Sequence, residues 1–439
     1  MRILHLSTSD VAGGASRAAQ RVHSGLLRLG CDSRMLVAKR YSGEPQVVEF
    51  KPKKDLVSKV RRRLRRKKIE ADLAPYEAMG LPPRYELFSD DRTEDGGALV
   101  EQIPRDCDVV NLHWVAGFVD HEPFFRYFAR ERRDVPLVWR LADMAPLTGG
   151  CHYDQDCGRF TAQCGRCPEI GSNDENDLSR QVWERKSRAL GMLSSDRLHL
   201  VGTSRWIAGE SRRSALLSRF PVTIIPNGLD VELFKPRDKR FSRDLLGVPQ
   251  DGAVVLFVAE TATVRRKGFA ELARAIEGIT GIDNLVLVSL GKGKPDLALA
   301  PGHRHVHLGR INDDRVLSMA YSAADVFVIP SLYESFGQTT IESMACGTPV
   351  VGFASGGIPD MVRPGVTGHL APTGDIAALR DAIVRVMRAP DERAAMSENC
   401  RRIAVEEYAM EVTARQYVRL YESLLAGERG AALNPGSNR

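Results

Sequence analysis

The chain has 439 residues, of which 43% are hydrophobic and 27% are charged, and its formal net charge is +6. This length and composition suit a soluble protein of two or three domains, and eight cysteines in so long a chain exclude a disulfide-scaffold class. No apolar run reaches the roughly 18 residues that a membrane-spanning helix needs, so we expect a cytoplasmic protein.

The first residues, MRILHLSTSD, enter a strand directly and lack a signal-peptide pattern. The sequence GGA follows, with Gly13 and Gly14 at the point where a helix should begin. Two interpretations are open for this loop: a tight strand-to-helix turn, or a backbone that a phosphate group can approach closely.

The excess of positive charge is concentrated in residues 51–68, which hold eleven Lys or Arg residues and a single Asp. Leu56, Val57, Val60 and Leu64 would fall on one face of a helix there. A basic amphipathic helix suits an anionic membrane surface, here the inner face of the cell membrane. The alternatives are a solvated helix face or a mobile arm. Nucleic acid is a weaker alternative because no aromatic residues interleave with the charges.

Short apolar runs alternate with helical segments along the whole chain, for example CDVVNLHWV, AVVLFVAE and DVFVIPS. Such alternation predicts α/β architecture with parallel sheets covered on both faces. The runs are too numerous for one sheet, so we expect two doubly wound, Rossmann-like domains that face each other across a cleft. In such folds ligands bind in loops that follow the carboxyl ends of strands.

A cysteine-rich segment, residues 148–170, follows one of these strands. Its cysteines have the spacing C-x5-C-x6-C-x2-C, and four thiolates so close together predict a structural zinc site. The predicted ligands are Cys151, Cys157, Cys164 and Cys167. His152 could replace one of them, and disulfides or free thiols are the alternatives.

Two carboxylates, Glu334 and Glu342, lie eight residues apart, just after the apolar run DVFVIPS. We expect a helix to begin near Ser335, with Ser335 and Gln338 forming a capping box, and its free amide groups to bind a diphosphate. Gly337 would let the ligand approach the backbone. The two carboxylates would then bind hydroxyl groups on a ribose and on a sugar, which is the shape of a nucleotide-sugar. The alternative, a carboxylate that complements the helix dipole, explains Glu334 and leaves Glu342 unexplained.

These residues also resemble a known family. ESFGQTTIE matches the E-x7-E motif of the retaining GT-B glycosyltransferases of glycosyltransferase family 4, and IPNGLD, RRKG, ESMACGTPVVGFASGGIPDMV and GVTGHL match in order. The cysteine-rich insert resembles one found in a subset of enzymes of surface-polysaccharide assembly. The resemblance covers nearly the whole chain and implies hexosyl transfer from a UDP- or GDP-sugar to a glycan or polyprenyl-linked acceptor. It also implies retention at the anomeric carbon without a required metal.

The resemblance assigns roles to individual residues. Glu334 and Lys267 would be catalytic, with Lys267 neutralising the diphosphate. The expected donor-binding residues are Gly14, Arg266, Lys267, Gly337, Glu342, Gly356 and Gly357. The arginine that usually precedes the lysine is replaced by ETATV, so Arg265 or Arg266 would substitute.

One position departs from the family pattern. Many members carry His-Asp at the end of the fourth strand, whereas this chain has Ala142 before Asp143. On the acceptor side we therefore expect Asp143, and His113 from the preceding strand, although a lone histidine beside a tryptophan is more often structural.

The expected domain limits follow from the apolar runs and from composition, except for the last helix, whose placement the resemblance implies. They are 1–215 for the acceptor-side domain, 216–405 for the nucleotide-sugar-binding domain, 406–426 for a helix that packs back on the first domain, and 427–439 for a disordered tail. Two other classes stay open: a dinucleotide-dependent oxidoreductase, which the absence of G-x-G-x-x-G argues against, and a non-catalytic nucleotide-binding or zinc-stabilised membrane scaffold. The sequence leaves the donor base, the sugar and the acceptor open.

Overall fold

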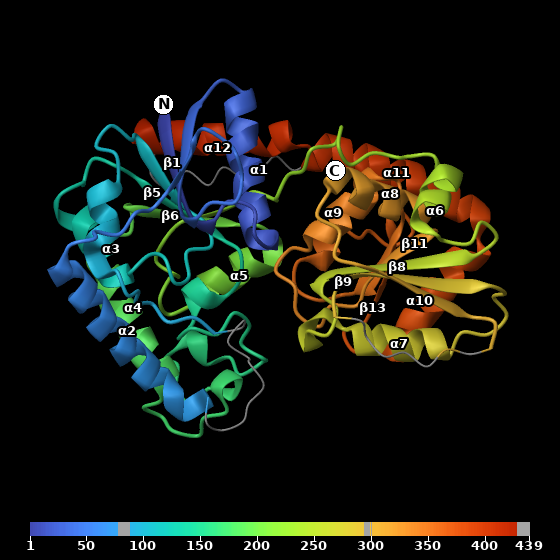
Figure 1. Ribbon diagram of the computed structural model, residues 1–439, viewed down its shortest axis with the longest axis horizontal. Helices are drawn as coiled ribbons and strands as arrows, with labels where there is room; N and C mark the ends of the chain where they lie inside the picture. The colour runs from blue at the N-terminus through green and yellow to red at the C-terminus, as the bar shows by residue number, and fades with distance from the viewer. Residues whose placement is uncertain (78–87, 294–298, 300, 428–439) are drawn as a thin grey trace. The chain divides into compact units, whose positions relative to one another are not determined.

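The computed structural model describes residues 1–77, 88–293, 299 and 301–427 (Figure 1). The chain forms two compact units, one built from Met1–Ile225 together with the segment from Ala414 onward, and one built from Pro226–Thr413. Each unit has its own parallel sheet and its own core.

The sheet of the first unit has seven strands in the order β3-β2-β1-β4-β5-β6-β7, and every neighbouring pair is parallel. The strands are β1 (Arg2–Ser9), β2 (Asp32–Lys39), β3 (Val47–Glu49), β4 (Val109–Leu112), β5 (Leu137–Leu141), β6 (Leu198–Gly202) and β7 (Val222–Ile224). β4 and β5 are buried along their whole length, as expected for central parallel strands covered on both faces.

The first unit also contains α-helices. They are α1 (Gly14–Arg28), α2 (Leu56–Glu77), α3 (His121–Arg130), α4 (Leu178–Gly191), α5 (Arg205–Arg213) and α12 (Met410–Leu425). One core cluster joins Val22 and Leu26 of α1 and Tyr417 and Leu420 of α12 to strand residues such as Val109. The last helix therefore contributes to the core of the first sheet.

The sheet of the second unit has six parallel strands in the order β10-β9-β8-β11-β12-β13. The strands are β8 (Ala253–Thr261), β9 (Leu285–Lys292), β10 (Arg304–Gly309), β11 (Val326–Ile329), β12 (Val350–Phe353) and β13 (Gly368–Ala371). The helices are α6 (Lys239–Leu246), α7 (Phe269–Glu277), α8 (Asp314–Ala323), α9 (Gln338–Ala345), α10 (Ile376–Arg388) and α11 (Pro390–Tyr408).

Alternate residues of these strands face two separate cores. Leu256 and Phe327 belong to the cluster that contains residues of α8, α9 and α11, whereas Val255 and Val328 belong to the cluster with α7 and α10. Figure 1 shows the two helix groups on opposite faces of the second sheet. The period of two along each strand thus produces a sheet with a helix layer on each side.

The limits of the two units differ from those expected at 215/216 and 405/406. They fall at Ile225/Pro226 and Thr413/Ala414, because β7 still pairs with β6 and because α12 joins the first core only from Ala414 onward.

The predicted disordered tail lies, apart from Gly427, outside the described residues. Among the described helices, none combines the length and the apolar character needed to cross a membrane.

Buried histidines in the first unit predict a pH-dependent stability. Burial lowers the pKa of His23 and of His199 to about 4 and that of His121 to about 3. In the unfolded chain each would titrate near 6.5, so unfolding takes up protons and stability is lost as the pH falls below that value.

We expect the free energy of unfolding in urea to fall between pH 7 and pH 5 by roughly 2 kcal/mol for each of these histidines. A His199→Gln variant should show a shallower pH dependence than the wild type. Equal slopes for the two proteins would show that His199 is not held neutral in the folded state.

Candidate functional site

Three loops meet at one edge of the second sheet. β8 and β11 are neighbours, but the chain continues from β8 to β9 on one side and from β11 to β12 on the other. This is a topological switch point, where open α/β sheets bind ligands beyond the carboxyl ends of the strands. The loops that follow β8, β11 and β12 leave the sheet at this position.

Backbone hydrogen bonds hold the three loops together. The Leu332 N–H donates to the Arg266 carbonyl over 2.8 Å, and the Gly357 N–H donates to the Glu334 carbonyl over 2.9 Å. The Ser355 hydroxyl donates to the Leu332 carbonyl over 2.7 Å. Residues that are distant in the sequence are thus fixed relative to one another by main-chain contacts rather than by side chains alone.

The close packing of these loops depends on Gly356. Its φ is +52°, and a Cβ atom at this position would lie 2.0 Å from the Glu334 carbonyl oxygen. No other residue type fits both the conformation and the space. The glycine therefore allows the loop after β12 to lie directly against the backbone of Glu334.

A group of charged side chains converges in this region. Lys267 Nζ lies 2.5 Å from Glu334 Oε2, and Arg266 Nη1 lies 4.0 Å from the same oxygen. Arg265 is turned elsewhere and pairs with Glu271 at 2.7 Å. Of the two arginines that could replace the missing family residue, Arg266 is thus the one beside Glu334.

Burial and pairing set the charge states of this group. Burial works to raise the pKa of Glu334, but Lys267, Arg266 and the Phe336 N–H outweigh it and hold the pKa below its usual value. Burial lowers the pKa of Lys267, and the carboxylate of Glu334 acts in the opposite direction. The result is a carboxylate and two cations that are partly withdrawn from water, where their fields are stronger than in bulk solvent.

The helix after Glu334 begins later than predicted. α9 starts at Gln338, with Gly337 as its N-cap at φ +96°, and no side chain caps it. The expected start near Ser335 and the Ser335–Gln338 capping box are therefore wrong, because the left-handed backbone at Gly337 interrupts any helix before it. The Gly337 Cα still lies against Glu334, since a Cβ there would lie 3.5 Å from Glu334 Cγ.

Glu342 lies on α9 and has a different environment from Glu334. Only 4% of its surface is exposed, and one carboxylate oxygen accepts a hydrogen bond from the Tyr321 hydroxyl at 3.1 Å. The structure brings Glu334, Lys267, Arg266, Gly337, Gly356 and Gly357 together. A ribose contact for the buried Glu342 stays a prediction.

In the first unit, the loop after β1 has an open backbone. Gly13 is the N-cap of α1 at φ +82°, and α1 begins at Gly14. An added Cβ at Gly14 would meet no atom within 4 Å. The backbone at the start of α1 is therefore accessible, as the predicted contact with a phosphate requires.

The acceptor-side candidates both line a small cavity of about 30 Å³ at the carboxyl ends of β4 and β5. His113 is 1% exposed, and its Nε2 lies 2.8 Å from His5 Nδ1. Burial, followed by the neighbouring His5, holds the pKa of His113 well below its usual value. The imidazole is therefore neutral and paired within the core.

Asp143 is held by three partners. Its Oδ2 accepts a hydrogen bond from Trp114 Nε1 at 3.0 Å and lies 3.3 Å from His152 Nδ1, and its Oδ1 accepts from the Ala145 N–H at 2.9 Å. His152 also lies 2.8 Å from the Ser89 hydroxyl through Nε2. Sequence reasoning considered His152 only as a zinc ligand, because nothing in the spacing shows that the insert folds back onto the end of β5.

The predicted zinc site is not formed. Within the described part of the chain, which includes all of residues 148–170, no three His, Cys, Asp or Glu side chains are grouped as metal ligands. Cys151, Cys164 and Cys167 are buried, whereas Cys157 is exposed, and all four are free thiols. Cys151 is instead hydrogen-bonded to Cys167, and Cys164 accepts the Gly149 N–H at 3.1 Å. The zinc prediction is therefore corrected.

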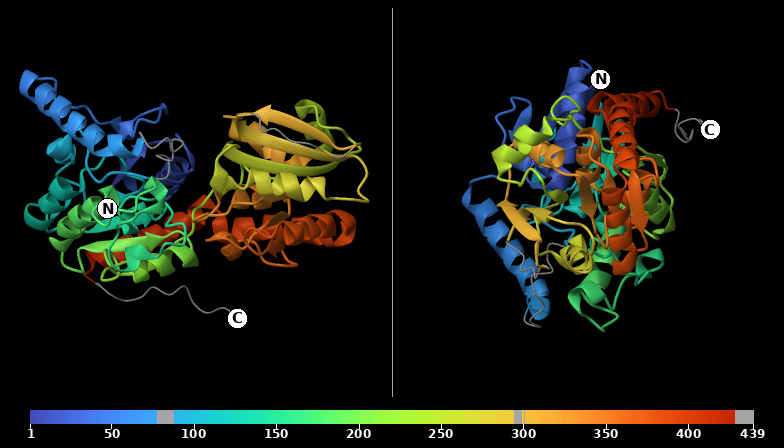
Figure 2. Two further views of the ribbon diagram at one scale, coloured as in Figure 1. Left: turned by 90° about the horizontal axis from the view of Figure 1, so that it is seen from below. Right: turned by 90° about the vertical axis from the view of Figure 1, so that its right-hand side faces the viewer.

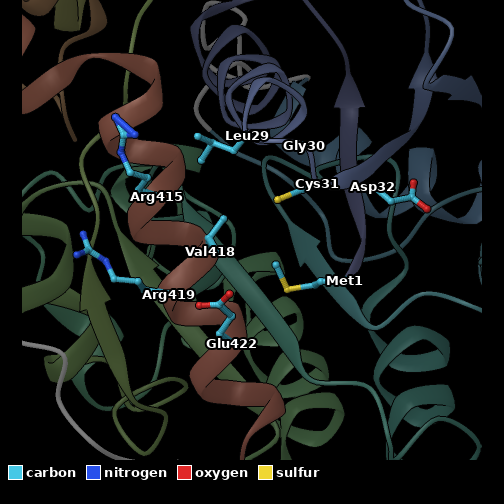
Figure 3. Close-up of a pocket in the computed structure, with 9 residues that line it drawn as sticks. All are labelled: Met1, Leu29, Gly30, Cys31, Asp32, Arg415, Val418, Arg419 and Glu422. Carbon is cyan, nitrogen blue, oxygen red and sulfur yellow. The ribbon is translucent and has the colours of Figure 1, made fainter.

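A larger cavity, of about 590 Å³, lies elsewhere in the first unit (Figure 3). It is lined by Met1, Leu29, Gly30, Cys31, Asp32, Arg415, Val418, Arg419 and Glu422. These residues belong to α12 and to the amino ends of β1 and β2, at the opposite edge of the sheet from the ligand-binding edge. Figure 3 shows the Arg415 and Arg419 side chains pointing away from Cys31.

Part of the chain matches known proteins in sequence. Residues 252–389 match the family model described as Glycosyl transferases group 1. The chain is 29% identical over 301 residues to D-inositol 3-phosphate glycosyltransferase of Mycobacterium leprae, a match that covers 65% of this chain and 61% of the relative. For the Mycobacterium tuberculosis enzyme of the same name the identity is also 29%, with 55% of the relative covered. The chain thus spans about three fifths of the length of these curated relatives.

Solved structures match along nearly the whole chain. Sucrose-phosphate synthase from Thermosynechococcus elongatus superposes with a TM-score of 0.66 at 20% identity, covering 97% of this chain and 100% of the other. Anabaena HepE in complex with UDP-glucose gives a TM-score of 0.65 at 17% identity, with coverage of 96% and 100%. These likenesses and the two parallel sheets confirm the predicted GT-B fold.

Gly356→Ala should disturb the site because the added methyl group would displace the Glu334 backbone. Gly374→Ala is the matched control, since Gly374 is also left-handed, at φ +83°, but a Cβ there meets no atom within 4 Å. Both variants carry the left-handed penalty of roughly 1–2 kcal/mol, and only Gly356→Ala should lose more. Urea unfolding measures the difference, and equal losses would show that the contact with Glu334 is unimportant.

Proposed function

We infer that this chain, whose residues 252–389 form a group 1 (family 4) glycosyltransferase domain within a GT-B fold, is a retaining glycosyltransferase that uses a nucleotide-diphospho-sugar. The observation that carries the proposal is the group of Lys267, Arg266 and Glu334 at the switch point of the second sheet. All three residues lie within the segment that the family model matches.

The chemistry of this group suits a diphosphate leaving group. When the bond between the sugar and the diphosphate breaks, negative charge grows on the phosphate oxygens. Lys267 and Arg266 are cations already fixed by Glu334 and by the loop backbone, so they need little reorganisation to stabilise that charge. The backbone at Gly337 and the start of α9 add N–H groups and the positive end of a helix dipole.

Glu334 has a second role in the proposal. Its carboxylate is kept ionised by the two cations, so it can accept hydrogen bonds from sugar hydroxyls and stabilise positive charge on the anomeric carbon. In the mechanism that the family implies, the acceptor hydroxyl attacks from the face that the diphosphate leaves, and the phosphate helps to take its proton. No protein side chain needs to act as the nucleophile.

For the donor and the acceptor we propose only a chemical class. The HepE structure holds UDP-glucose, which supports a UDP-sugar, while a GDP-sugar stays open. A glycan or lipid-linked acceptor in surface-polysaccharide assembly is proposed from the cysteine-rich insert. Asp143, held beside His152 and Trp114, is the proposed acceptor contact in the first unit. A peripheral position on an anionic membrane is also proposed, and α2 supports it.

A non-catalytic nucleotide-binding protein of the same fold is the second candidate. Ala142, at the position where many members carry histidine, favours it. The two candidates differ in turnover, because both would bind a nucleotide but only the enzyme would cleave the donor.

Incubation of the protein with a panel of UDP- and GDP-sugars, followed by mass spectrometry, tests the proposal. We expect slow hydrolysis of one donor without acceptor and sugar transfer when glycan or polyprenyl-phosphate acceptors are added. Thermal stabilisation by UDP or GDP without hydrolysis of any donor would favour the non-catalytic candidate, and stabilisation by NAD alone would overturn both.

Lys267→Ala should reduce kcat by roughly 100-fold or more, because it removes a cation that acts mainly on the departing diphosphate. Glu342→Ala should chiefly weaken donor binding. Lys235→Ala is the control, since Lys235 pairs with Glu232 on the surface of the same unit. Steady-state kinetics and nucleotide titration separate the effects, and a Lys267→Ala enzyme with wild-type kcat would refute the phosphate role.

A further inference from the structure

The small cavity in the first unit is formed by loops that follow two neighbouring strands. Trp114 follows β4 and Asp143 follows β5, and both line the cavity. His121, the first residue of α3, and Lys186 of α4 line it as well. These two helices pack side by side, as Figure 1 and Figure 2 show. The cavity therefore lies beyond the carboxyl ends of parallel strands, where open α/β sheets bind ligands.

The imidazole of His121 is held at this cavity by aromatic contacts. It lies edge-to-face against Trp139, with 5.4 Å between ring centroids, and against Phe125 at 5.7 Å. The residue is 7% exposed, and within the described part of the chain its Nδ1 is buried and has no hydrogen-bond partner. Buried polar atoms are normally paired, so an unpaired ring nitrogen beside a cavity indicates a partner from outside the protein.

The charge state of His121 suits a neutral partner. Burial lowers its pKa to about 3, so the imidazole is neutral at pH 7. One nitrogen of a neutral imidazole donates a hydrogen bond and the other accepts one. A hydroxyl group also donates and accepts, and it therefore matches this ring. An ionised phosphate brings acceptors and negative charge, which a neutral ring does not balance.

Asp143 places a carboxylate at the same cavity. Its oxygens accept hydrogen bonds from Trp114 Nε1 at 3.0 Å and from the Ala145 N–H at 2.9 Å. The imidazole of His152 lies 3.3 Å from one of them. A carboxylate fixed in this way binds a hydroxyl group through a charge-assisted hydrogen bond and repels a phosphate.

The lysine at the cavity is directed at backbone carbonyls. Lys186 Nζ donates to the Ala145 carbonyl at 2.7 Å and to the Thr148 carbonyl at 3.1 Å. A second carboxylate at the wall, Asp90, is paired with two arginines that are not among the lining residues. Among the described residues that line the cavity, Lys186 is the one Lys or Arg. The cavity thus differs from the candidate diphosphate site of the second unit, where two cations converge on one carboxylate.

The size of the cavity favours the same kind of ligand. Its volume of about 30 Å³ holds roughly two water-sized groups. A hydroxyl or hydroxymethyl group fits this volume, whereas a tetrahedral phosphate is several times larger. Size, charge and the unpaired imidazole nitrogen therefore agree.

We propose that this cavity binds a hydroxyl or hydroxymethyl group of a sugar through Asp143 and His121, and that it selects a sugar rather than a phosphate as the acceptor. The proposal rests on the proposed function, because it concerns the acceptor of the same reaction, and it adds His121 as a specificity-determining residue. If the acceptor is lipid-linked, an earlier transfer reaction must already have attached a sugar to the lipid phosphate. The protein would then extend a glycan rather than begin one.

Assays with matched acceptor probes test the proposal. Octyl glycosides of glucose, galactose, mannose and rhamnose offer sugar hydroxyls, whereas octyl phosphate and polyprenyl phosphate offer phosphate oxygens. With the donor that mass spectrometry identifies, we expect transfer to at least one octyl glycoside and to neither phosphate. Saturation-transfer NMR measures binding of the same probes without turnover. Transfer to a phosphate probe at an equal or higher rate, or binding of none of the glycosides, would overturn the proposal.

Two substitutions of His121 separate a hydrogen bond from a packing role. His121→Leu removes the polar ring, whereas His121→Asn keeps a polar group near the position of Nδ1. We expect His121→Leu to raise the acceptor KM about tenfold or more, and His121→Asn to restore most of the affinity. Donor hydrolysis without acceptor should be unchanged in both variants. An unchanged acceptor KM in His121→Leu would show that the cavity holds only water and would contradict the proposal.

The matched control is His199→Gln. His199 is also a buried histidine of the first sheet, but its ring pairs with the Thr223 hydroxyl at 2.8 Å and lies outside the cavity. This variant should keep the wild-type acceptor KM at pH 7. Thermal unfolding establishes that each variant is folded. If His121→Leu is not, Asp143→Asn replaces it, and this variant should lose glycoside binding and bind octyl phosphate more tightly than the wild type does.

Failure of this proposal and failure of the proposed function give different results. A protein that hydrolyses a donor and transfers its sugar to a phosphate probe remains a glycosyltransferase but lacks the sugar-selecting cavity. A protein that hydrolyses no donor, yet binds an octyl glycoside in a manner that His121→Leu abolishes, retains the cavity and refutes only the enzymatic assignment.

Discussion

The ion pair between Lys267 and Glu334 depends on the topology of the second sheet, and the candidate site depends on that pair. The two residues follow β8 and β11, strands that are neighbours in space but separated in the sequence by two other strands. Burying a charged lysine costs free energy unless a carboxylate lies beside it. Burying a charged glutamate likewise costs free energy unless a cation lies beside it. Each residue therefore makes the other's burial possible, and neither has this environment without the parallel arrangement of the sheet.

This mutual dependence explains why the surrounding backbone is so closely packed. The carbonyl of Glu334 accepts the Gly357 N–H, and Gly356 lies directly against that carbonyl. A looser loop would expose the pair further to water and would weaken the field at the position where a diphosphate is expected. The loops after three strands thus act as one rigid support, which is what electrostatic stabilisation of a leaving group requires.

Sequence patterns were sufficient for the parts of the molecule that depend on periodicity and on strand order. The alternation of apolar runs predicted two parallel sheets, and the position of Glu334 after a strand predicted that it lies at a carboxyl end. Details set by tertiary packing were not predictable. The start of α9 depends on the left-handed backbone at Gly337, and the contact between His152 and Asp143 depends on how the insert folds back.

The four cysteines also show what sequence spacing alone does not determine. Their spacing suits a metal, but spacing does not determine the direction of each side chain, and Cys157 is exposed while the other three are buried. A helical pattern in α2 likewise predicted amphipathicity without showing which side faces the protein. The ion pairs of Arg62, Arg65 and Asp72 show which side faces the protein. Leu73 and Tyr76 of the same helix pack against a buried apolar cluster.

The exposed aliphatic side chains of α2 bear on how an acceptor would reach the protein in the proposed function. Exposed Leu56 and Leu64 gain nothing from the fold of a lone chain, and burying aliphatic surface is the main favourable term available to them. The proposed membrane surface would supply such an apolar environment. If the acceptor is lipid-linked, adsorption to the bilayer confines enzyme and acceptor to one surface, which raises their encounter rate without any new contact in the active site.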